Sequence, residues 1–209
     1  MKRIIVCCEG KSEHLYIQQL NTFMESWSGD NLRSLFFFPI CVDCGDFTPV
    51  KRIIQETRKS NPRTEIQVWV DYDLYHPNRK NNKLKKYLSR PQGIPVFHFS
   101  FQNFEDFLIL HYPPETLLKW ELKFNNTGHF SHPLHGKDYH PIFKTIVPGY
   151  EKGLLPAQFV NAATLGNLKR NLPNRPIPPP PGEPGFKDFA TFLLAELETA
   201  HPDIFTPHA

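Results

Sequence analysis

The first hundred residues alternate between short apolar runs and longer amphipathic segments, and this alternation constrains the fold more than any other feature of the chain. Four runs have the length and composition of buried strands: residues 4–8, 35–42, 66–70 and 94–99. Between them, residues 12–27 and 50–58 have the apolar spacing of amphipathic helices. The order strand, helix, strand, helix predicts an α/β fold with a mainly parallel sheet flanked by helices.

The rest of the chain has a weaker pattern. We expect a basic helix at 79–89, a core helix at 104–111 that ends before Pro113 and Pro114, and a loop at 125–141. Further helices are predicted at 157–172 and 186–200. The predicted division is a catalytic core (1–120), a His-rich loop and helical extension that completes the domain (121–172), a Pro-rich spacer (173–185), and a C-terminal helix with a tail (186–209).

The spacer holds seven of the 21 prolines, four of them consecutive. Such a run favours polyproline II, a semi-rigid conformation without packed structure. We therefore expect the last helix to be held at a distance from the sheet, where it could dock back on the domain or on a partner.

Composition excludes several classes of protein. The 18 Phe, 7 Tyr and 3 Trp residues need a core, which excludes general disorder. Since no apolar run reaches the roughly 18 residues that span a bilayer, we expect no membrane association. Four cysteines are too few for a disulfide scaffold, so we expect a cytoplasmic protein with reduced thiols. A net charge of +3 is too small to identify a nucleic-acid-binding protein by itself.

Acidic residues follow two of the predicted strands. Glu9 ends the first strand, and Asp71 and Asp73 end the third. In parallel sheets the ligand site lies beyond the carboxyl ends of the strands, so these carboxylates can converge. Mg²⁺ takes oxygen ligands, often one or two carboxylates plus substrate phosphate. Glu13, four residues after Glu9, could serve a second ion. The alternative is that these acids are helix caps or solvated loop residues.

Several segments carry a resemblance to a known family. Residues 8–13 (Cys-Glu-Gly-Lys-Ser-Glu) with Tyr16, the Asp-Tyr-Asp at 71–73, and residues 101–111 resemble motifs of the TOPRIM domain family, RloB-like branch. Residues 150–152 (Tyr-Glu-Lys) resemble the family's C-terminal Tyr-x-Lys. The resemblance covers residues 3 to about 112 and, more loosely, 142–170. Two positions depart from it, because Ser12 replaces the usual Thr and the segment before Phe104 lacks a Pro.

The resemblance implies a Mg²⁺- or Mn²⁺-dependent nuclease that hydrolyses phosphodiester bonds. Glu9 would serve in acid/base or metal chemistry, Asp71 and Asp73 would bind metal, Glu13 and Glu105 would complete or orient the metal sites, and Lys152 would be the transition-state cation. Relatives often act beside an ATPase in anti-phage defence and cut RNA such as tRNA. RNA is therefore expected in preference to DNA, with a separate ABC- or AAA-type ATPase as a partner, because this chain has no P-loop.

A basic segment follows the third strand. Residues 77–90 contain six basic side chains and no acid: Arg79, Lys80, Lys83, Lys85, Lys86 and Arg90. We expect them to border the metal site and to bind nucleic-acid phosphates without sequence preference. The alternative is a solvated helix face.

Histidines and cysteines leave further alternatives open. Four histidines have spacings compatible with zinc, although neutral loop histidines are the favoured interpretation: His129, His132, His135 and His140. His111 is expected to be a hydrogen-bonded core residue. Four cysteines could hold structural zinc, but most of them lie in apolar strands, where Cys acts as a small hydrophobe: Cys7, Cys8, Cys41 and Cys44.

Taken together, these features predict a metal-dependent nuclease acting on RNA or DNA. A non-catalytic metal- and nucleic-acid-binding subunit, or a hydrolase of a small cyclic oligonucleotide signal, are the alternatives. The sequence leaves the oligomeric state open, with a homo-oligomer among the possible assemblies.

Overall fold

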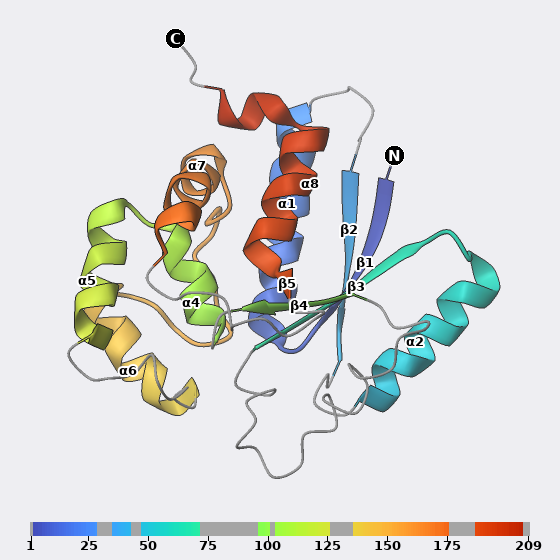
Figure 1. Cartoon of the computed structure of the whole chain (residues 1–209), viewed down its shortest axis with the longest axis horizontal. Coiled ribbons are helices and arrows are strands. Elements are labelled where there is room, and N and C mark those ends of the chain that lie inside the picture. The colour runs from blue at the N-terminus through green and yellow to red at the C-terminus, as the bar shows by residue number, and fades with distance from the viewer. Residues whose placement is uncertain are drawn as a thin grey trace.

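A computed structural model describes residues 2–28, 35–42, 47–71, 96–100, 103–125, 136–175 and 187–206 (Figure 1). The first half contains β1 (Lys2–Cys8), α1 (Lys11–Ser28), β2 (Leu35–Cys41), α2 (Phe47–Ser60), β3 (Glu65–Asp71) and β4 (Val96–Ser100). The second half contains α4 (Phe104–Leu108), η2 (Ile109–His111), α5 (Pro114–Asn125), α6 (Gly136–Ile146), α7 (Ala162–Asn171), η4 (Leu172–Asn174), β5 (Lys187–Asp188), α8 (Phe189–Ala200) and η5 (Pro202–Phe205).

The strands of the described residues form one five-stranded sheet in the order β2-β1-β3-β4-β5, and every neighbouring pair is parallel. The predicted α/β fold with a parallel sheet is therefore confirmed. From β1 the chain moves outward to β2, and from β3 it moves in the opposite direction to β4. The carboxyl ends of β1 and β3 therefore flank the point where the strand order reverses, which is where open α/β sheets bind ligands.

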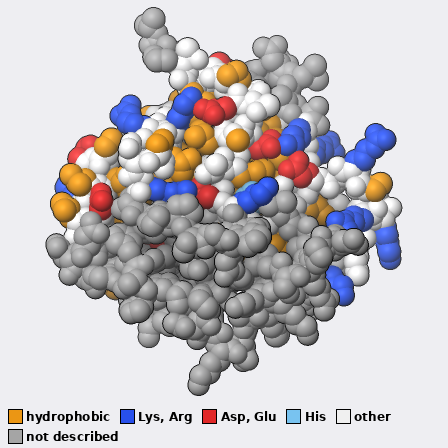
Figure 2. Space-filling model, viewed as in Figure 1, with side chains coloured by type: hydrophobic (Ala, Val, Ile, Leu, Met, Phe, Trp, Pro, Cys, Tyr) orange, Lys and Arg blue, Asp and Glu red, His pale blue; other side chains and the backbone are white. Residues whose placement is uncertain are grey.

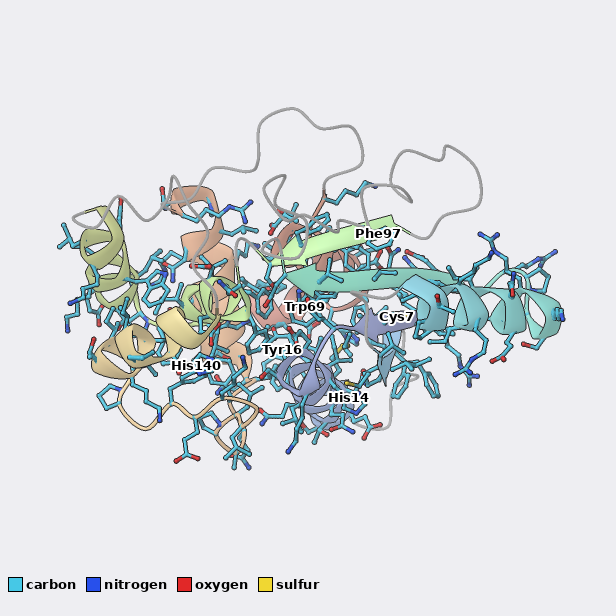
Figure 3. The ribbon with its side chains drawn as sticks, turned by 90° about the horizontal axis from the view of Figure 1, so that it is seen from below. Cys7, His14, Tyr16, Trp69, Phe97 and His140 are labelled. Carbon is cyan, nitrogen blue, oxygen red and sulfur yellow. The ribbon has the colours of Figure 1, made fainter. Side chains whose placement is uncertain are left out.

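The sheet separates two hydrophobic clusters because successive strand residues point to opposite faces. Ile4 and Val6 belong to the larger cluster, with residues of α1, α4, α7 and α8. Cys7 and Val68 belong to the smaller cluster, with Val50 and other residues of α2. Figure 3, which looks along the sheet from below, shows Tyr16 and Trp69 on one side of the strands and Phe97 on the other.

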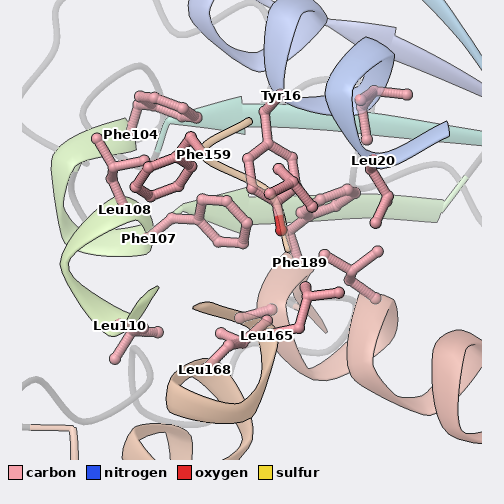
Figure 4. Packing of buried hydrophobic residues seen from close by; sticks show 14 of the residues in the cluster. Tyr16, Leu20, Phe104, Phe107, Leu108, Leu110, Phe159, Leu165, Leu168 and Phe189 are labelled. Atoms are coloured by element: carbon pink, nitrogen blue, oxygen red, sulfur yellow. The ribbon is translucent and has the colours of Figure 1, made fainter. Parts of the chain in front are cut away.

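The larger cluster is built around Trp69 of β3. Its ring stacks on Phe189 of α8 with centroids 3.7 Å apart, and Phe107 of α4 packs against it edge-on at 4.8 Å. Figure 4 shows Phe107 and Phe189 together with Tyr16 in this cluster. Truncating a buried aromatic ring of this kind costs about 3–5 kcal/mol. The final helix is thus part of the core: it docks on the domain itself, one of the two expected positions, and is not held away from the sheet.

β2 lies at one edge of the sheet, and this edge is blunted. The Val42 N–H donates to Cys8 O at 2.9 Å, so even-numbered residues of this segment face β1 and odd-numbered ones face outward. The backbone N–H and C=O of Phe37 point away from β1. The N–H donates to the side-chain amide oxygen of Asn21 at 3.1 Å, and the C=O accepts from its amide nitrogen at 2.6 Å. Pro39, also outward-facing, has no N–H. Exposed strand edges invite pairing with other chains, and these two residues oppose it.

Several predictions for the second half need correction. The loop expected at 125–141 gives way to α6 at Gly136, which accommodates Pro141 inside the helix. α5 was not predicted, and the helix expected from residue 157 begins at Ala162, where the side chain of Asn161 accepts a hydrogen bond from the Thr164 N–H. The segment expected to be helical from 186 contributes β5 before α8 begins.

The helix expected at 79–89 and most of the Pro-rich spacer lie outside the described residues. Among the helices of the described ranges, none has the length and apolar character needed to cross a bilayer.

Candidate active site

The carboxyl ends of β1 and β3 bring two predicted acids together. Cys8 pairs with Trp69 in the parallel register, so Glu9 and Asp71 emerge at the same edge of the sheet. The Glu9 N–H donates to Trp69 O at 3.1 Å, and the Asp71 N–H donates to Oε2 of Glu9 at 2.8 Å. These bonds fix both strand ends and hold the Glu9 carboxylate beside Asp71.

Glu13 lies in the first turn of α1 and is almost fully buried, with 4% of its surface exposed. A Cβ added to Gly10 would lie 3.0 Å from Oε2 of Glu13, so the absence of a side chain at Gly10 leaves room for this carboxylate. Burial, with a smaller contribution from the negative charge of Glu105, raises the pKa of Glu13 to about 7 against the lowering effects of backbone hydrogen bonds and Lys152. The structure thus places a carboxyl group where its ionised form is destabilised.

Glu105 enters from α4 and is 3% exposed. The hydroxyl of Tyr150 donates to Oε1 of Glu105 at 2.9 Å, and Nε2 of His140 on α6 lies 2.9 Å from the same oxygen. Figure 3 shows His140 on α6, on the side of the sheet where Tyr16 and α1 lie. Burial and the neighbouring carboxylate of Glu105 raise the pKa of Tyr150, so its hydroxyl remains a donor. Partial burial lowers the pKa of His140, against the opposing effect of Glu105.

The neighbouring acid of α4, Asp106, has a different task. Its Oδ2 accepts from the Asn103 N–H at 3.1 Å, and its Oδ1 accepts from Nε1 of buried Trp120 at 3.1 Å. Asp106 therefore closes the first turn of α4 and anchors it to α5. This anchoring holds Glu105 in place.

The carboxyl ends of β1 and β3, the first turns of α1 and α4, and the turn after α6 border one pocket of about 220 Å³. It is lined by Glu9, Gly10, Lys11, Ser12, Glu13, Asp71, Asn103, Phe104, Glu105, Tyr150, Lys152 and Gly153. Four carboxylates thus face two lysines. Gly153 has a φ of +74°, a conformation that favours glycine, and its backbone approaches the stem of Lys11. An all-oxygen donor set with a surplus of negative charge suits a hard divalent cation.

Of the predicted site residues, the pocket contains Glu9, Glu13, Asp71, Glu105 and Lys152. Asp73 and the six basic residues of 77–90 lie outside the described residues. The same holds for Cys44 and for three of the clustered histidines.

The structure bears on the predicted core position of His111 and on the alternative of a zinc site at the cysteines. His111 is a core residue, with Nε2 2.8 Å from the Tyr16 hydroxyl and Nδ1 3.2 Å from Phe107 O. Cys7 and Cys8 point to opposite faces of the sheet and belong to different clusters. A shared zinc ion for these two thiols is therefore sterically unsuitable.

Sequence patterns assigned no role at this site to Lys11 and Asn103, which line the pocket, or to His140, which lies beside Glu105. Lys11 has the position of an ordinary helix start, Asn103 that of a helix cap, and His140 that of a loop histidine. His140 reaches Glu105 only through the packing of α6 in the folded chain, a long-range contact with no local sequence pattern. The position of His140, one turn before the apolar residues of α6, could have indicated a role at the site only if that helix had been recognised from the sequence.

No protein-family model matches this chain, and no curated protein or solved structure matches it either. The comparisons therefore assign neither a family nor an activity. Any functional assignment depends on the side chains that meet in the pocket.

Proposed function

We propose that this protein is a TOPRIM-like, Mg²⁺- or Mn²⁺-dependent phosphodiesterase that cleaves nucleic acid, RNA in preference to DNA. The observation that carries the proposal is the convergence of Glu9, Glu13, Asp71 and Glu105 with Lys152 on one pocket. These side chains come from β1, α1, β3, α4 and the turn after α6, segments far apart in sequence. Glu13 and Glu105 are buried and the other two acids are partly buried, so a bound cation would relieve the repulsion among their carboxylates.

The donor chemistry fits the proposed ion. Within the described ranges no three His, Cys, Asp or Glu side chains form a ready-made metal cage. Mg²⁺ does not need one, because it usually keeps several waters and is bound through one or two carboxylates plus substrate phosphates. Glu9 and Asp71 would supply these carboxylates, and the raised pKa of Glu13 reflects a cost that a nearby cation would remove.

The chain's own groups divide the remaining work. Glu9 is oriented by the Asp71 N–H, and Glu105 is oriented by the Tyr150 hydroxyl, with Nε2 of His140 beside the same oxygen. Lys152 lies at the pocket, where its ammonium group can neutralise charge that develops on a phosphoryl oxygen. When bound, the metal ion would activate water and stabilise the leaving oxygen.

The proposal is tested by incubating the purified chain with labelled tRNA, single-stranded DNA and a cyclic oligonucleotide, in Mn²⁺ and in EDTA. We expect metal-dependent cleavage by the wild type and a loss of at least a hundredfold in Glu9→Gln and Asp71→Asn. The matched control is Glu115→Gln, an exposed glutamate of α5 that does not line the pocket. Full activity of either pocket variant, or cleavage in EDTA, contradicts the proposal.

The same assay separates the alternatives. Binding of Mn²⁺ without cleavage of any of the three substrates identifies a binding subunit. Cleavage of the cyclic oligonucleotide alone identifies a hydrolase of a small signal. An associated ATPase and a role in anti-phage defence belong to the proposal only through the resemblance of residues 8–13 and 101–111 to the RloB-like branch.

A further inference from the structure

The segment 47–64, made of α2 and the turn after it, concentrates positive charge. It carries five basic side chains, Lys51, Arg52, Arg58, Lys59 and Arg63, against the single acid Glu56. Its net charge of +4 exceeds the +3 of the entire chain. With residues 77–90, which carry six basic side chains and no acid, it is one of two strongly basic segments of the chain.

The charges lie on one side of α2. Val50 and Ile54 face the smaller hydrophobic cluster and are buried, whereas all five basic side chains are exposed. Figure 2 shows Lys and Arg side chains gathered at the edge of the molecule where Figure 1 draws α2. The pair Arg52–Glu56 is 3.9 Å apart and largely exposed, so it contributes little. Within the described ranges no acid forms an ion pair with the other four basic residues.

The spacing of these charges suits a chain of phosphates. Lys51 and Arg58 are seven residues apart, as are Arg52 and Lys59, and seven residues of α-helix span about 10 Å. A row of this length can contact more than one phosphate of an extended nucleic-acid strand. Residues 48–64, whose side chains the structure describes, include no aromatic side chain that could stack on a base, so contacts there would be sequence-independent.

The position of α2 relates this surface to the pocket. α2 begins six residues after β2 ends at Cys41, and Cys41 pairs with Cys8 at the sheet edge that carries Glu9. The first turn of α2 thus begins near the carboxyl-end edge of the sheet, where the pocket lies, while the body of α2 packs on the face opposite α1 and α4. The pocket has twice as many carboxylates as lysines and would repel a polyanion, so a nucleic acid needs attraction from elsewhere on the surface.

We infer that the outer face of α2 binds the sugar–phosphate backbone of a nucleic-acid polymer whose scissile bond lies in the pocket. The inference rests on the proposed function and narrows its substrate class to a polymer. A pocket of about 220 Å³ holds little more than the scissile phosphate and its neighbours, so only an extended substrate can reach α2.

The test is a binding measurement on the full chain in EDTA, with a fluorescent 20-nucleotide single-stranded RNA followed by anisotropy at several salt concentrations. We expect the triple variant Lys51→Ala, Arg58→Ala, Lys59→Ala to weaken binding at least tenfold at 0.1 M salt. Each lost phosphate contact lowers the slope of log K against log [salt] by about 0.7 for single strands, so the slope should fall by about 2. RNAs of unrelated sequence should lose affinity equally.

The matched control removes three exposed lysines from α5 and α6, as Lys119→Ala, Lys123→Ala, Lys144→Ala. It changes the net charge equally and should retain the wild-type affinity. An equal loss in both triple variants, or no loss in the α2 variant, overturns the inference. Binding to anionic lipid vesicles without binding to RNA overturns it as well. Because the assay involves no cleavage, its result is independent of whether the pocket hydrolyses phosphodiesters.

Discussion

The hydroxyl of Tyr150 donates a 2.9 Å hydrogen bond to Oε1 of Glu105, a buried carboxylate 45 residues earlier in the chain. Nε2 of His140 lies 2.9 Å from the same oxygen. The second half of the protein therefore positions an acid in a pocket whose other carboxylates come from the first strands and helix. The site is complete only when α6 and the turn after it are in place.

Tyr150→Phe should lower catalysis while the chain stays folded. A hydrogen bond to a charged group contributes about 1.5–3 kcal/mol, and each 1.36 kcal/mol of barrier is a factor of ten in rate. We expect kcat to fall roughly ten- to a hundredfold, measured with the RNA substrate that the wild type cleaves best. Tyr112→Phe is the control, since Tyr112 packs on Phe159 outside the pocket. A wild-type kcat in Tyr150→Phe contradicts the positioning of Glu105 by this bond.

Glu13→Gln should stabilise the metal-free protein. Since the pKa of Glu13 rises from an ordinary 4.5 to about 7, the folded state holds a proton that the unfolded state releases between these pH values. Stability contributed by this group therefore falls as pH rises from 4.5 to 7, by on the order of 3 kcal/mol. Urea unfolding in EDTA at pH 8 should show Glu13→Gln to be the more stable protein, and added Mn²⁺ should stabilise the wild type more than the variant. A less stable Glu13→Gln in EDTA would refute this account of the carboxyl.

The contribution of His111 to stability should have the opposite pH dependence and should fall at acidic pH. Burial lowers its pKa to about 4 from 6.5, so between these values the unfolded state binds a proton that the folded state does not. Its contribution is lost as pH falls through this window, at about 1.4 kcal/mol per pH unit. Plots of the free energy of unfolding against pH should differ in slope between the wild type and His111→Gln from pH 6.5 to 4. An NMR titration that finds His111 protonating near pH 6.5 in the folded protein contradicts the prediction.

Asn21→Leu should open the edge of the sheet. The substitution leaves the outward N–H and C=O of Phe37 without their partner, which costs about 1–3 kcal/mol for buried groups. We expect a lower urea midpoint together with self-association in light scattering at high protein concentration. Thr22→Leu, one position along α1, is the control. A monomeric Asn21→Leu protein of unchanged stability would show that Asn21 does not protect this edge.

The features predicted well from sequence are those fixed by local patterns. Continuous apolar runs such as Ile4–Cys8 have few alternatives to a buried strand, and the position of Glu9 and Asp71 after two such runs brought them to one sheet edge. The approach of His140 to Glu105 and the stacking of Phe189 on Trp69 depend on contacts between distant segments. Two predictions based on proline content were wrong. Pro141, expected in a loop, lies inside α6, and the helix after the proline-rich stretch is packed in the core instead of being held at a distance.

The central claim is that the pocket cleaves phosphodiester bonds with the help of a divalent cation. Its most direct test is the rate of cleavage of an end-labelled tRNA by the wild type and by Glu9→Gln. Each protein is assayed in about 5 mM Mn²⁺, chosen to saturate the proposed site, and in EDTA. The account predicts cleavage by the wild type in Mn²⁺ alone and a loss of at least a hundredfold in Glu9→Gln at an unchanged melting temperature. Equal rates for the two proteins, or cleavage by the wild type in EDTA, would contradict it.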